Sequence, residues 1–413
     1  MSAPAIAVLA TLDSKDDAAR YTCDVLREAG TEPWLMDLSL RPHDKTGADV
    51  GGNELAKASG VSWDDLADMV RSEAAETMIT GGTKLLLERF ETGDLFGVIG
   101  VGGANGSTVF CAMMRALPPL FPKVMVTPVA ATSAVQWYVA ESDIAMFPTI
   151  GDIVLNRITK AVMENAAYAV AGMAKAWNKR LARDHDSQPV IGVSSFGNLQ
   201  KCVDRITERL EERGFEVMQF HASGPGGKAL ENLARQGELA GIIDLTTSEL
   251  TDLLTGGVYS AGDGRLRSAG AAGLPQVVVP GSLDHTNWWV GECPECYKSR
   301  EFYQYNVEIL LMRTNAEEMR ELAKMMAERL NEAKGPVTVL IPTKGFSQHI
   351  IRETQNIDGN IVGSWLQPET DQAFTDSMHE HLTNGDIKEL DLHINDQEFA
   401  DACVEELMKS LEP

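Results

Sequence analysis

The sequence predicts an α/β protein with two Rossmann-like doubly wound domains, mainly parallel sheets and a cleft between the domains. Three observations support this fold class: short apolar runs alternate with helix-like segments, glycine-rich turns follow two of these runs, and the alternation restarts after a polar stretch in mid-chain. The chain has 413 residues, more than one domain usually contains. We therefore expect an N-terminal domain at residues 1–184 and a C-terminal domain at residues 185–413.

The first half of the chain begins with strand-like and helix-like segments in turn. The first helix-like segment starts at its N-cap Ser14 and ends before Gly30. The second covers residues 62–90, with an interruption expected at Gly81 and Gly82. Strands are expected at residues 5–11, 31–38, 96–101 and 123–126.

Residues 151–183 form a long helix-compatible stretch that is rich in alanine and methionine. We interpret it as the joint between the two domains. Its small-residue faces are typical of close packing against a second subunit, and equally typical of an ordinary core helix. The sequence leaves these two interpretations open.

The alternation begins again at Pro189. A helix over residues 199–213 ends before Gly214, and a second glycine-rich turn, within HASGPGGKALENLARQG, leads into a further helix. Ligands bind at the carboxyl ends of strands in doubly wound sheets, so the polar residues that follow these strands are site candidates. Strands are expected at residues 190–194, 215–220, 241–245, 276–280, 337–341 and 387–392.

The chain is strongly acidic, with a formal net charge of −24 at pH 7. This charge opposes binding to nucleic acid or to an anionic membrane surface, and the sequence contains no run of Lys or Arg. No apolar stretch reaches the roughly 18 residues of a membrane span, and no secretory signal pattern is present. We expect a cytoplasmic protein without a nucleic-acid or membrane partner.

The cysteines are scattered and are expected to be reduced thiols. Only Cys293 and Cys296 form a CxxC pair, and no second pair or histidine pair at ligand spacing completes a zinc site. A metal or redox role for this pair stays open beside its interpretation as an ordinary loop.

The most informative segment is VIGVGGANGST, from Val98 to Thr108, where an apolar run breaks into a glycine-rich turn ahead of a helix. Such a turn lets backbone N–H groups approach an anion, and the positive end of the helix favours negative charge. No lysine follows the last glycine, as a P-loop requires, and the glycines do not have the dinucleotide-binding spacing. The segment indicates a phosphate-binding turn, with a plain strand-to-helix turn as the alternative.

Charged and hydroxyl residues follow several of the predicted strands. After the first strand, Asp13 has the chemistry to hold magnesium and Lys15 to hold phosphate, against the alternative of a solvated salt bridge. In the second half, Arg265 has the chemistry to hold a carboxylate or phosphate, and Asp284 with His285 to form an acid–base pair. Structural roles, such as helix capping or a surface histidine, are the alternatives. Further candidates are Thr246, Thr247, Glu249, Lys344, Ser347 and His349.

Segments in both halves of the chain match one known family. They are ATLDSKDDAARY, VIGVGGANGS, MRALPPLFPKVMVTP and NAAYAVAGM in the first half, and FHASGPGGKALENL, DLTTSELTDLLTGGVYSAGDGRL, PQVVVPGSLD, LMRTNAEE and HINDQEFA in the second. On these segments the chain resembles the Tm-one-like ATP-binding family. The resemblance implies two Rossmann-like subdomains, a homodimer or higher homo-oligomer, and ATP with Mg²⁺ bound to the first subdomain.

The family's nucleotide segments match residues 11–16, 102–107 and 127–132 of this chain. The TLDTKG-like pattern reads TLDSKD here, the GGSGGT-like turn reads GGANGS, and the STVASG-like segment reads TPVAAT. The resemblance and the residue types together predict Asp13 as the metal ligand. The predicted cofactor site comprises Thr11, Asp13, Lys15, Gly102, Gly103, Ala104, Asn105, Gly106, Ser107, Thr108 and Thr127.

The sequence favours an enzyme of small-molecule metabolism, such as an ATP-dependent transferase or ligase, with a small carboxylate- or carbonyl-bearing substrate in the cleft. Two alternatives are a nucleotide-responsive binding or regulatory protein that consumes no ATP, and an ATP-independent hydrolase or lyase of the C-terminal domain. The catalytic candidates are Asp284, His285, His349 and Glu249. The substrate-binding candidates are Gly226, Gly227, Thr246, Thr247, Arg265, Lys344 and Ser347.

Overall fold

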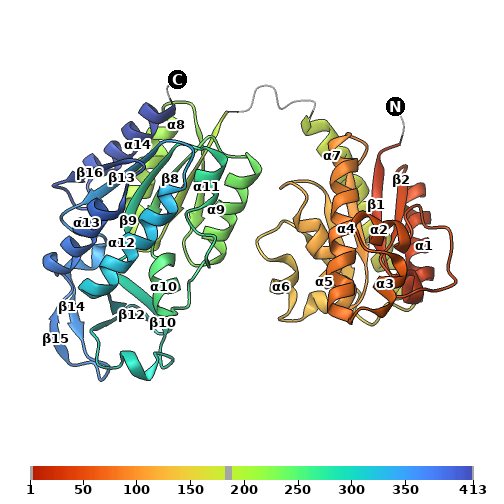
Figure 1. The fold of residues 1–413 in the computed structure, drawn as a ribbon, viewed down its shortest axis with the longest axis horizontal. Coiled ribbons are helices and arrows are strands. Elements are labelled where there is room, and N and C mark those ends of the chain that lie inside the picture. Colours follow the sequence, from red (N-terminus) through yellow and green to blue (C-terminus); the bar gives the residue numbers. More distant parts are fainter. Residues whose placement is uncertain (1–2, 182–187, 412–413) are drawn as a thin grey trace. The chain divides into compact units, whose positions relative to one another are not determined.

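The computed structural model describes residues 3–181 and 188–411, and the chain divides into two compact units, Met1–Asp186 and Ser187–Pro413 (Figure 1). Each unit contains a parallel sheet with helices, which confirms the α/β class and the two parallel sheets. The boundary predicted after residue 184 lies outside the described residues. The cleft between the domains stays a prediction.

Unit 1 is built on a sheet of five strands. Every pairing in this sheet is parallel, and the strand order is β2-β1-β3-β4-β5. The direction of strand addition therefore reverses between β1 and β3, and we call this place the switch point of unit 1. The strands are β1 (Ala5–Ala10), β2 (Glu32–Asp37), β3 (Gly97–Val101), β4 (Lys123–Thr127) and β5 (Ala145–Pro148).

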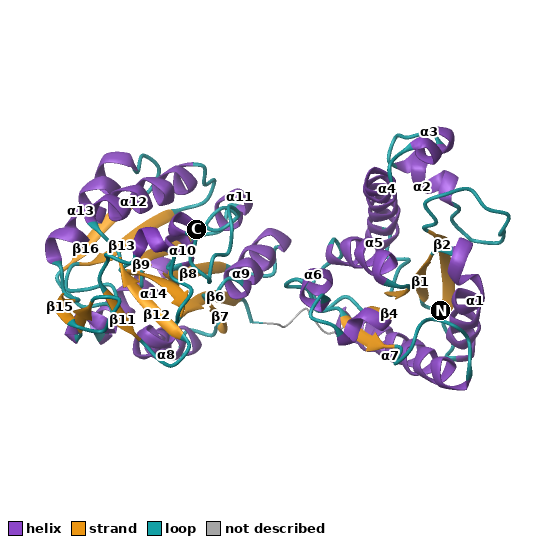
Figure 2. Ribbon diagram, turned by 90° about the horizontal axis from the view of Figure 1, so that it is seen from below, coloured by secondary structure: helices purple, strands orange, loops and turns teal. Residues whose placement is uncertain are grey.

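Helices cover both faces of the unit 1 sheet because β1 is apolar on both sides. Ile6 and Val8 pack with α1 (Leu12–Glu28) and α7 (Arg157–Leu181), whereas the alternate residues Ala7 and Leu9 pack on the opposite face. Figure 2 shows these helix layers on the two sides of the strands. The helices of the opposite face are α4 (Arg71–Glu91) and α5 (Ala104–Arg115), joined by the short helices α2 (Gly52–Ala58), α3 (Trp63–Asp68) and α6 (Val135–Val139).

Helix α4 runs through Gly81 and Gly82, so the interruption predicted there is wrong. A Cβ atom at Gly81 would lie 1.9 Å from the carbonyl oxygen of Leu55 in α2. The glycine is therefore a site of close helix packing rather than a break. Helix α1 also begins earlier than expected, at Leu12 instead of Ser14, because the Asp37 carboxylate accepts the Leu12 N–H at 3.1 Å.

The alanine face of α7 belongs to the core of unit 1. Met163, Ala166, Ala167, Val170 and Ala174 are buried in the cluster that also contains the β1 residues. This face therefore packs as an ordinary core helix packs, and the predicted packing against a second subunit stays a prediction.

Unit 2 repeats the connectivity of unit 1 and adds a sixth strand. All pairings of its main sheet are parallel, and the order is β16-β13-β9-β8-β6-β7, so the direction reverses between β6 and β8. The strands are β6 (Val190–Ser195), β7 (Glu216–His221), β8 (Gly241–Thr246), β9 (Gln276–Gly281), β13 (Val337–Pro342) and β16 (Asp386–Leu390).

Helices also cover both faces of the unit 2 sheet. In β9, Val277 and Val279 pack with α8 (Gln200–Glu211) and α14 (Gln397–Leu411), and Val278 packs on the other face. The helices on that face and at the strand ends are α9 (Pro225–Gln236), α10 (Glu249–Thr255), α11 (Ser268–Ala272), α12 (Ala316–Asn331) and α13 (Pro368–His381).

An antiparallel sheet in unit 2 was not expected from the sequence. Its first strand, β10 (His285–Trp289), begins four residues after β9 ends. The antiparallel sheet therefore lies at the end of unit 2 where the carboxyl ends of the parallel strands are (Figure 1). The strand order in this antiparallel sheet is β10, β12 (Ile309–Arg313), β11 (Phe302–Gln304), β14 (Glu353–Gln355) and β15 (Ile361–Ser364).

Within the described ranges, no helix is long and apolar enough to cross a membrane.

Candidate functional site

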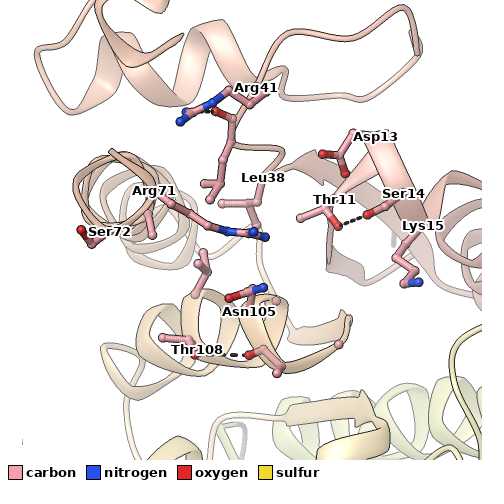
Figure 3. Close-up of a pocket in the computed structure, with 16 residues that line it drawn as sticks. Thr11, Asp13, Ser14, Lys15, Leu38, Arg41, Arg71, Ser72, Asn105 and Thr108 are labelled. Atoms are coloured by element: carbon pink, nitrogen blue, oxygen red, sulfur yellow. Dashed lines mark hydrogen bonds between the residues drawn. The ribbon is translucent and has the colours of Figure 1, made fainter. Parts of the chain in front are cut away.

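A pocket of about 760 Å³ lies at the switch point of unit 1, and we call it the α5 pocket (Figure 3). The turn after β1, the segment after β2 and the first turns of α4 and α5 form its walls. Its lining residues are Thr11, Asp13, Ser14, Lys15, Leu38, Leu40, Arg41, Arg71, Ser72, Ala75, Gly103, Ala104, Asn105, Gly106, Thr108 and Val109.

The N-terminus of α5 opens into this pocket without an anionic cap. The N–H groups of Ala104, Asn105 and Gly106 have no hydrogen-bond partner among the described residues, and the first helical bond runs from the Ser107 N–H to the Gly103 carbonyl. At Gly103, the N-cap residue, no described residue beyond its two chain neighbours has an atom within 4 Å of the position of a Cβ. The positive end of the α5 dipole therefore faces open space.

Two cations line the α5 pocket with neither an ion pair nor a side-chain hydrogen bond in residues 3–181 and 188–411. They are Lys15, where α1 has a non-helical backbone with φ −129° and ψ 23°, and Arg71 at the start of α4. Figure 3 shows the Arg71 guanidinium extending from α4 toward Asn105. Arg41 differs, because its guanidinium donates to the carbonyl groups of Leu66 and Met69.

Not every predicted cofactor residue reaches the α5 pocket. Ser107 and Thr127 are fully buried behind the turn, where the Ser107 hydroxyl donates to the Thr127 hydroxyl at 2.8 Å. Gly102 also lies behind, since a Cβ there would be 2.8 Å from the Phe110 ring. Arg71 also lines the pocket but could not be predicted from the sequence, because it stands in no motif and only the fold brings it there. The predicted residues that line the pocket are Thr11, Asp13, Lys15, Gly103, Ala104, Asn105, Gly106 and Thr108.

The second glycine-rich turn leads into α9, whose N-terminus is already filled by a carboxylate of the chain itself. Glu249 Oε1 accepts the N–H groups of Gly224 and Gly227 at 2.7 and 3.1 Å. A Cβ atom at Gly227 would lie 2.0 Å from Glu249 Oε2, and one at Gly226 would lie 1.9 Å from the His221 carbonyl oxygen. Both glycines therefore permit close internal packing.

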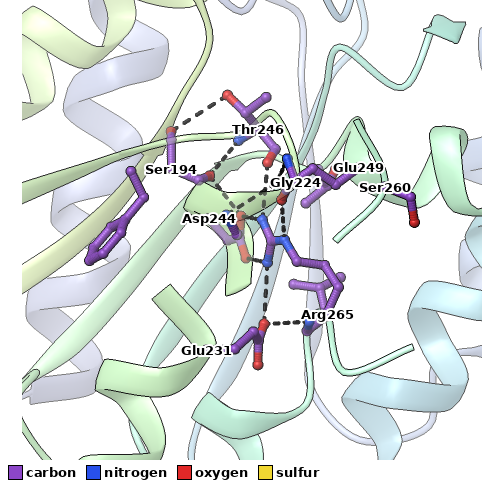
Figure 4. A network of polar contacts seen from close by, with 12 residues as sticks. Ser194, Gly224, Glu231, Asp244, Thr246, Glu249, Ser260 and Arg265 are labelled. Atoms are coloured by element: carbon purple, nitrogen blue, oxygen red, sulfur yellow. Dashed lines mark hydrogen bonds and ion pairs between the residues drawn. The ribbon is translucent and has the colours of Figure 1, made fainter. Parts of the chain in front are cut away.

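Arg265 lies at the centre of this buried network (Figure 4). Its guanidinium donates to both carboxylate oxygens of Asp244 at 2.5 and 2.6 Å and to Glu249 at 2.6 Å, and Glu231 lies 3.4 Å away. Burial alone lowers the pKa of Arg265, but the surrounding carboxylates raise it well above its ordinary value. The Arg265 network thus holds its charges by mutual pairing inside the protein.

The other hydroxyl candidates near β8 also form internal hydrogen bonds. The Thr247 hydroxyl donates to the Val279 carbonyl at 2.9 Å, and the Thr246 hydroxyl donates to the Ser194 carbonyl at 3.5 Å. Lys344 lies apart, on the surface, where it pairs with Asp391. The predicted substrate roles of these residues stay predictions.

The strand-end prediction does bring Asp284, His285, Ser347 and His349 together in unit 2. Asp284 Oδ1 lies 2.9 Å from His285 Nδ1, and Asp284 Oδ2 accepts the Ser347 hydroxyl at 2.6 Å and the Trp365 indole N–H at 2.8 Å. These side chains are at most 2% exposed. Burial raises the pKa of the Asp284 carboxyl, but the hydrogen bond and charge of His285, with Arg313 and His349, lower it overall.

A cavity of about 170 Å³ adjoins this cluster, and we call it the histidine cavity. The rings of His285 and His349 meet edge to face at 5.4 Å, and His349 lines the cavity. Two lining residues have a buried atom without a hydrogen-bond partner among the described residues, His349 Nδ1 and Asn287 Oδ1. His285 Nε2 also has none, and the His285 ring lies behind the wall, 6.2 Å from the ring of the lining residue Phe196. The lining residues are Phe196, Gly197, Asn198, His221, Tyr259, Asn287, Tyr305, Asn306, Ile309, Leu311 and His349.

Neither site contains a preformed cluster of metal ligands in the part of the chain that the structure describes. Over the described ranges, no group of three or more His, Cys, Asp or Glu side chains is arranged to hold a metal ion. Cys293 is buried and Cys296 exposed, both as free thiols. A metal or redox role for this pair stays a prediction.

Family models and relatives match almost the whole chain. Residues 4–179 match the N-terminal domain, and residues 188–411 the C-terminal domain, of the uncharacterised protein family UPF0261. A UPF0261 protein of Clostridium tetani is 34% identical over 98% of this chain and 99% of its own, and one of Mesorhizobium japonicum is 35% identical over 96% and 97%. The tomato (Solanum lycopersicum) ToMV resistance protein Tm-1 is 32% identical over 83% of this chain, which spans 44% of that protein. The predicted Tm-one-like resemblance is confirmed.

Proposed function

The chain belongs to the UPF0261 family, and we propose that it is an ATP-binding enzyme of small-molecule metabolism whose nucleotide phosphates bind at the N-terminus of α5. We interpret both units as Rossmann-like doubly wound sheets, in which ligands bind at the switch point. The observation that carries the proposal is the uncapped start of α5, where the N–H groups of Ala104, Asn105 and Gly106 open into the α5 pocket.

Charge supports a phosphate ligand at this place. The protein carries a formal charge of −24, so an anion needs local positive groups to bind. The α5 pocket supplies the helix dipole and the side chains of Lys15 and Arg71, which are unpaired within the described residues. A polyphosphate chain can accept hydrogen bonds from these amides and pair with these cations.

The size and walls of the α5 pocket suit a ligand larger than inorganic phosphate. Its volume of about 760 Å³ falls within the range that drug-sized ligands and cofactors occupy. Leu38, Leu40 and Val109 supply apolar wall, against which a nucleotide base can pack. The phosphates would then lie toward Gly103 and the rest of the nucleotide along α4.

Magnesium fits the same arrangement. Asp13 is the carboxylate that lines the α5 pocket, and nucleotide-bound Mg²⁺ takes one or two protein carboxylates together with phosphate oxygens and water. The bound ion would neutralise phosphate charge that Lys15, Arg71 and the α5 amides do not reach.

Two substitutions at one position test the proposal. Gly103→Asp places a carboxylate at the N-cap, where it competes with phosphate for the α5 amides, and the space around Gly103 admits the side chain. Gly103→Ala adds only a methyl group and is the matched control. At 100 times its dissociation constant, Mg-ATP stabilises a binding protein by about 2.7 kcal/mol, or roughly 5–10 °C in melting temperature.

We expect Mg-ATP to raise the melting temperature of the wild type and of Gly103→Ala, and to leave that of Gly103→Asp nearly unchanged. The measurement is a thermal melt with ATP, ADP and tripolyphosphate, each with and without Mg²⁺. A wild type that none of these ligands stabilises would contradict the proposal. So would a Gly103→Asp variant with the full wild-type shift.

A further inference from the structure

We propose that the histidine cavity of unit 2 is a general acid–base site that moves a proton next to the carbonyl group of a small uncharged hydroxy ketone or hydroxy aldehyde. His285 is the base, His349 is the hydrogen-bond donor to the carbonyl oxygen, and Asn287 accepts the substrate hydroxyl. This proposal concerns unit 2 alone, so its failure and that of the nucleotide proposal for unit 1 are independent.

The residues around His285 leave its Nε2 atom free to act as a base. Asp284 is held by the Ser347 hydroxyl and the Trp365 indole, and its other oxygen faces His285 Nδ1 at 2.9 Å. An anionic carboxylate accepts only, so His285 carries its proton on Nδ1. In neutral His285 the Nε2 lone pair is then bare, buried and without a partner in the described structure. That is the arrangement of an oriented histidine base.

The surroundings of His349 prepare it as a donor. The Ser282 hydroxyl donates to Asn198 Oδ1 at 2.8 Å, so the Asn198 amide group turns its NH₂ toward His349 Nε2, 3.2 Å away. His349 Nε2 is therefore the acceptor, and the proton lies on Nδ1, which has no partner in the described structure. Burial, with the charge of His285, lowers the pKa of His349 to about 4, so the ring is a neutral donor near pH 7.

Asn287 supplies a third fixed group on the same face of β10 as His285, two residues along the strand. Its side-chain NH₂ donates to Asp252 Oδ2 at 2.8 Å, and its backbone N–H donates to Asp252 Oδ1 at 3.0 Å. The amide group is thereby fixed with Oδ1 unpaired, and Asn287 lines the histidine cavity. A buried lone acceptor of this kind is satisfied by a ligand hydroxyl.

The walls of the cavity set the class of substrate. Among the described residues, no Lys, Arg, Asp or Glu lines it, and burial lowers the pKa of its other histidine, His221. Its remaining walls are uncharged: aromatic and aliphatic residues such as Phe196, Tyr259 and Leu311, together with the amide side chains of Asn198, Asn287 and Asn306. A carboxylate or phosphate would find no counter-charge there, whereas a volume of about 170 Å³ accommodates an uncharged molecule of a few heavy atoms.

The reaction balances without a further reagent. His285 Nε2 takes a proton from the carbon next to the carbonyl group, so a C–H bond breaks and an N–H bond forms. The electron pair moves into a C=C bond, and the carbonyl π electrons move onto the oxygen, where the His349 N–H stabilises the developing charge. Return of a proton from His285 Nε2 to the same carbon, while the electron pair on oxygen re-forms the C=O bond, regenerates the substrate and both histidines.

A serine-nucleophile mechanism does not fit the same residues. The Ser347 hydroxyl donates to Asp284 Oδ2, the carboxylate oxygen that does not contact His285. His285 Nε2, the atom that would activate a nucleophile, has no hydroxyl partner in the described structure. Ser347 therefore positions Asp284, which in turn orients His285.

The first test is proton exchange in D₂O with hydroxyacetone and dihydroxyacetone, followed by loss of the α-proton signals in NMR spectra. We expect the wild type to catalyse exchange and His285→Gln to lose at least about 100-fold of the rate, since general acid–base catalysis contributes 10²–10⁴-fold. The matched control is His379→Gln, because His379 lies half-exposed on α13 in a pair with Glu389. Thermal melts show whether each variant is folded.

A second measurement does not depend on the probe. In ¹⁵N-histidine-labelled protein, long-range ¹H–¹⁵N spectra report which ring nitrogen carries the proton, and we expect Nδ1–H at both His285 and His349. Catalysed exchange that disappears in His285→Gln and persists in His379→Gln supports the proposal. The absence of protein-dependent exchange with both hydroxy ketones, or an Nε2–H form of neutral His285, overturns it.

Discussion

The two glycine-rich turns of this protein lead into helices that differ in what meets their N-termini. At α5 in unit 1, the amides of Ala104, Asn105 and Gly106 face a pocket. At α9 in unit 2, the amides of Gly224 and Gly227 face the carboxylate of Glu249. A glycine-rich turn therefore predicts an anion at a helix N-terminus, but the fold decides whether that anion is a ligand or a side chain of the chain itself.

The difference extends to the cations beside each helix. Lys15 and Arg71 are unpaired among the described residues of unit 1, whereas Arg265 in unit 2 is fully buried between carboxylates. An unpaired cation near solvent costs little and remains available to a ligand. A buried one requires its partners for folding.

The largest effect on stability should come from removing the central cation of the Arg265 network in unit 2. Arg265→Met removes the cation from Asp244, Glu249 and Glu231 and leaves their charges buried without compensation. Removing one partner from a buried ion pair destabilises a protein by about 3–5 kcal/mol. We expect a loss of that size in the free energy of unfolding of unit 2, measured by guanidinium chloride titration.

The matched substitution in unit 1 is Arg71→Met, which removes an exposed, unpaired cation. It should change the unfolding free energy by less than about 0.5 kcal/mol, because surface substitutions away from special features usually do. If both variants were equally stable, the contrast between a structural and a ligand-facing arginine would be wrong.

The next largest effect is a pH dependence of stability that comes from the buried side chain of His349. The pKa of His349 is about 4 in the folded protein, against 6.5 for an ordinary histidine, because burial and the charge of His285 oppose its protonation. The unfolded chain then binds a proton on this residue at a higher pH than the folded chain does. The contribution of His349 to stability is complete above about pH 6.5 and is lost as the pH falls toward 4.

His349→Gln removes this dependence. We expect the stability of the wild type, relative to that of the variant, to fall by about 3 kcal/mol between pH 7 and pH 4. Asp284, His285 and Arg352 are the charged or titratable groups that act on His349, and all remain in the variant. Denaturant titrations across this pH range measure the difference, and a constant difference would show that His349 titrates normally in the folded protein.

Much of the fold could be predicted from the sequence because parallel strands in these sheets are short, continuous apolar runs. The runs at Ile6, Val98 and Val277 mark buried strands of both units. The antiparallel sheet could not be predicted in this way. Its strands are three to five residues long, and β11, at Phe302–Gln304, pairs with β14 some fifty residues later in the chain.

The candidate sites were likewise predictable only in part. The rule that strand ends meet at one edge of a sheet correctly brought His285 and His349 together. It could not show that Asn198 orients His349, or that Glu249 fills the start of α9, because those contacts depend on side-chain directions fixed by packing. Arg71 was missed for the same reason, since its position in α4 carries no sequence signal.

The smallest predicted gain in stability tests the open N-terminus of α5 directly. Gly103→Asp gives α5 the capping carboxylate that Glu249 already gives α9, and no described residue beyond the two chain neighbours has an atom within 4 Å of the new Cβ position. Asp at an N-cap is only a few tenths of a kcal/mol better than Gly, and its charge adds about 0.3–1 kcal/mol at a helix N-terminus. We therefore expect the free energy of unfolding of unit 1 to be about 0.5–1 kcal/mol higher in Gly103→Asp than in the wild type.

The sign of this change separates a ligand site from a structural defect. A substitution that stabilises the free protein and abolishes stabilisation by Mg-ATP has removed binding without damaging the fold, because the new carboxylate takes the place of the ligand's phosphate. Denaturant titration of Gly103→Asp and Gly103→Ala, without nucleotide, measures the change at low ionic strength, where screening is weak. A destabilised Gly103→Asp would mean that α5 is capped by the chain after all, as α9 is, and the two turns would then be equivalent.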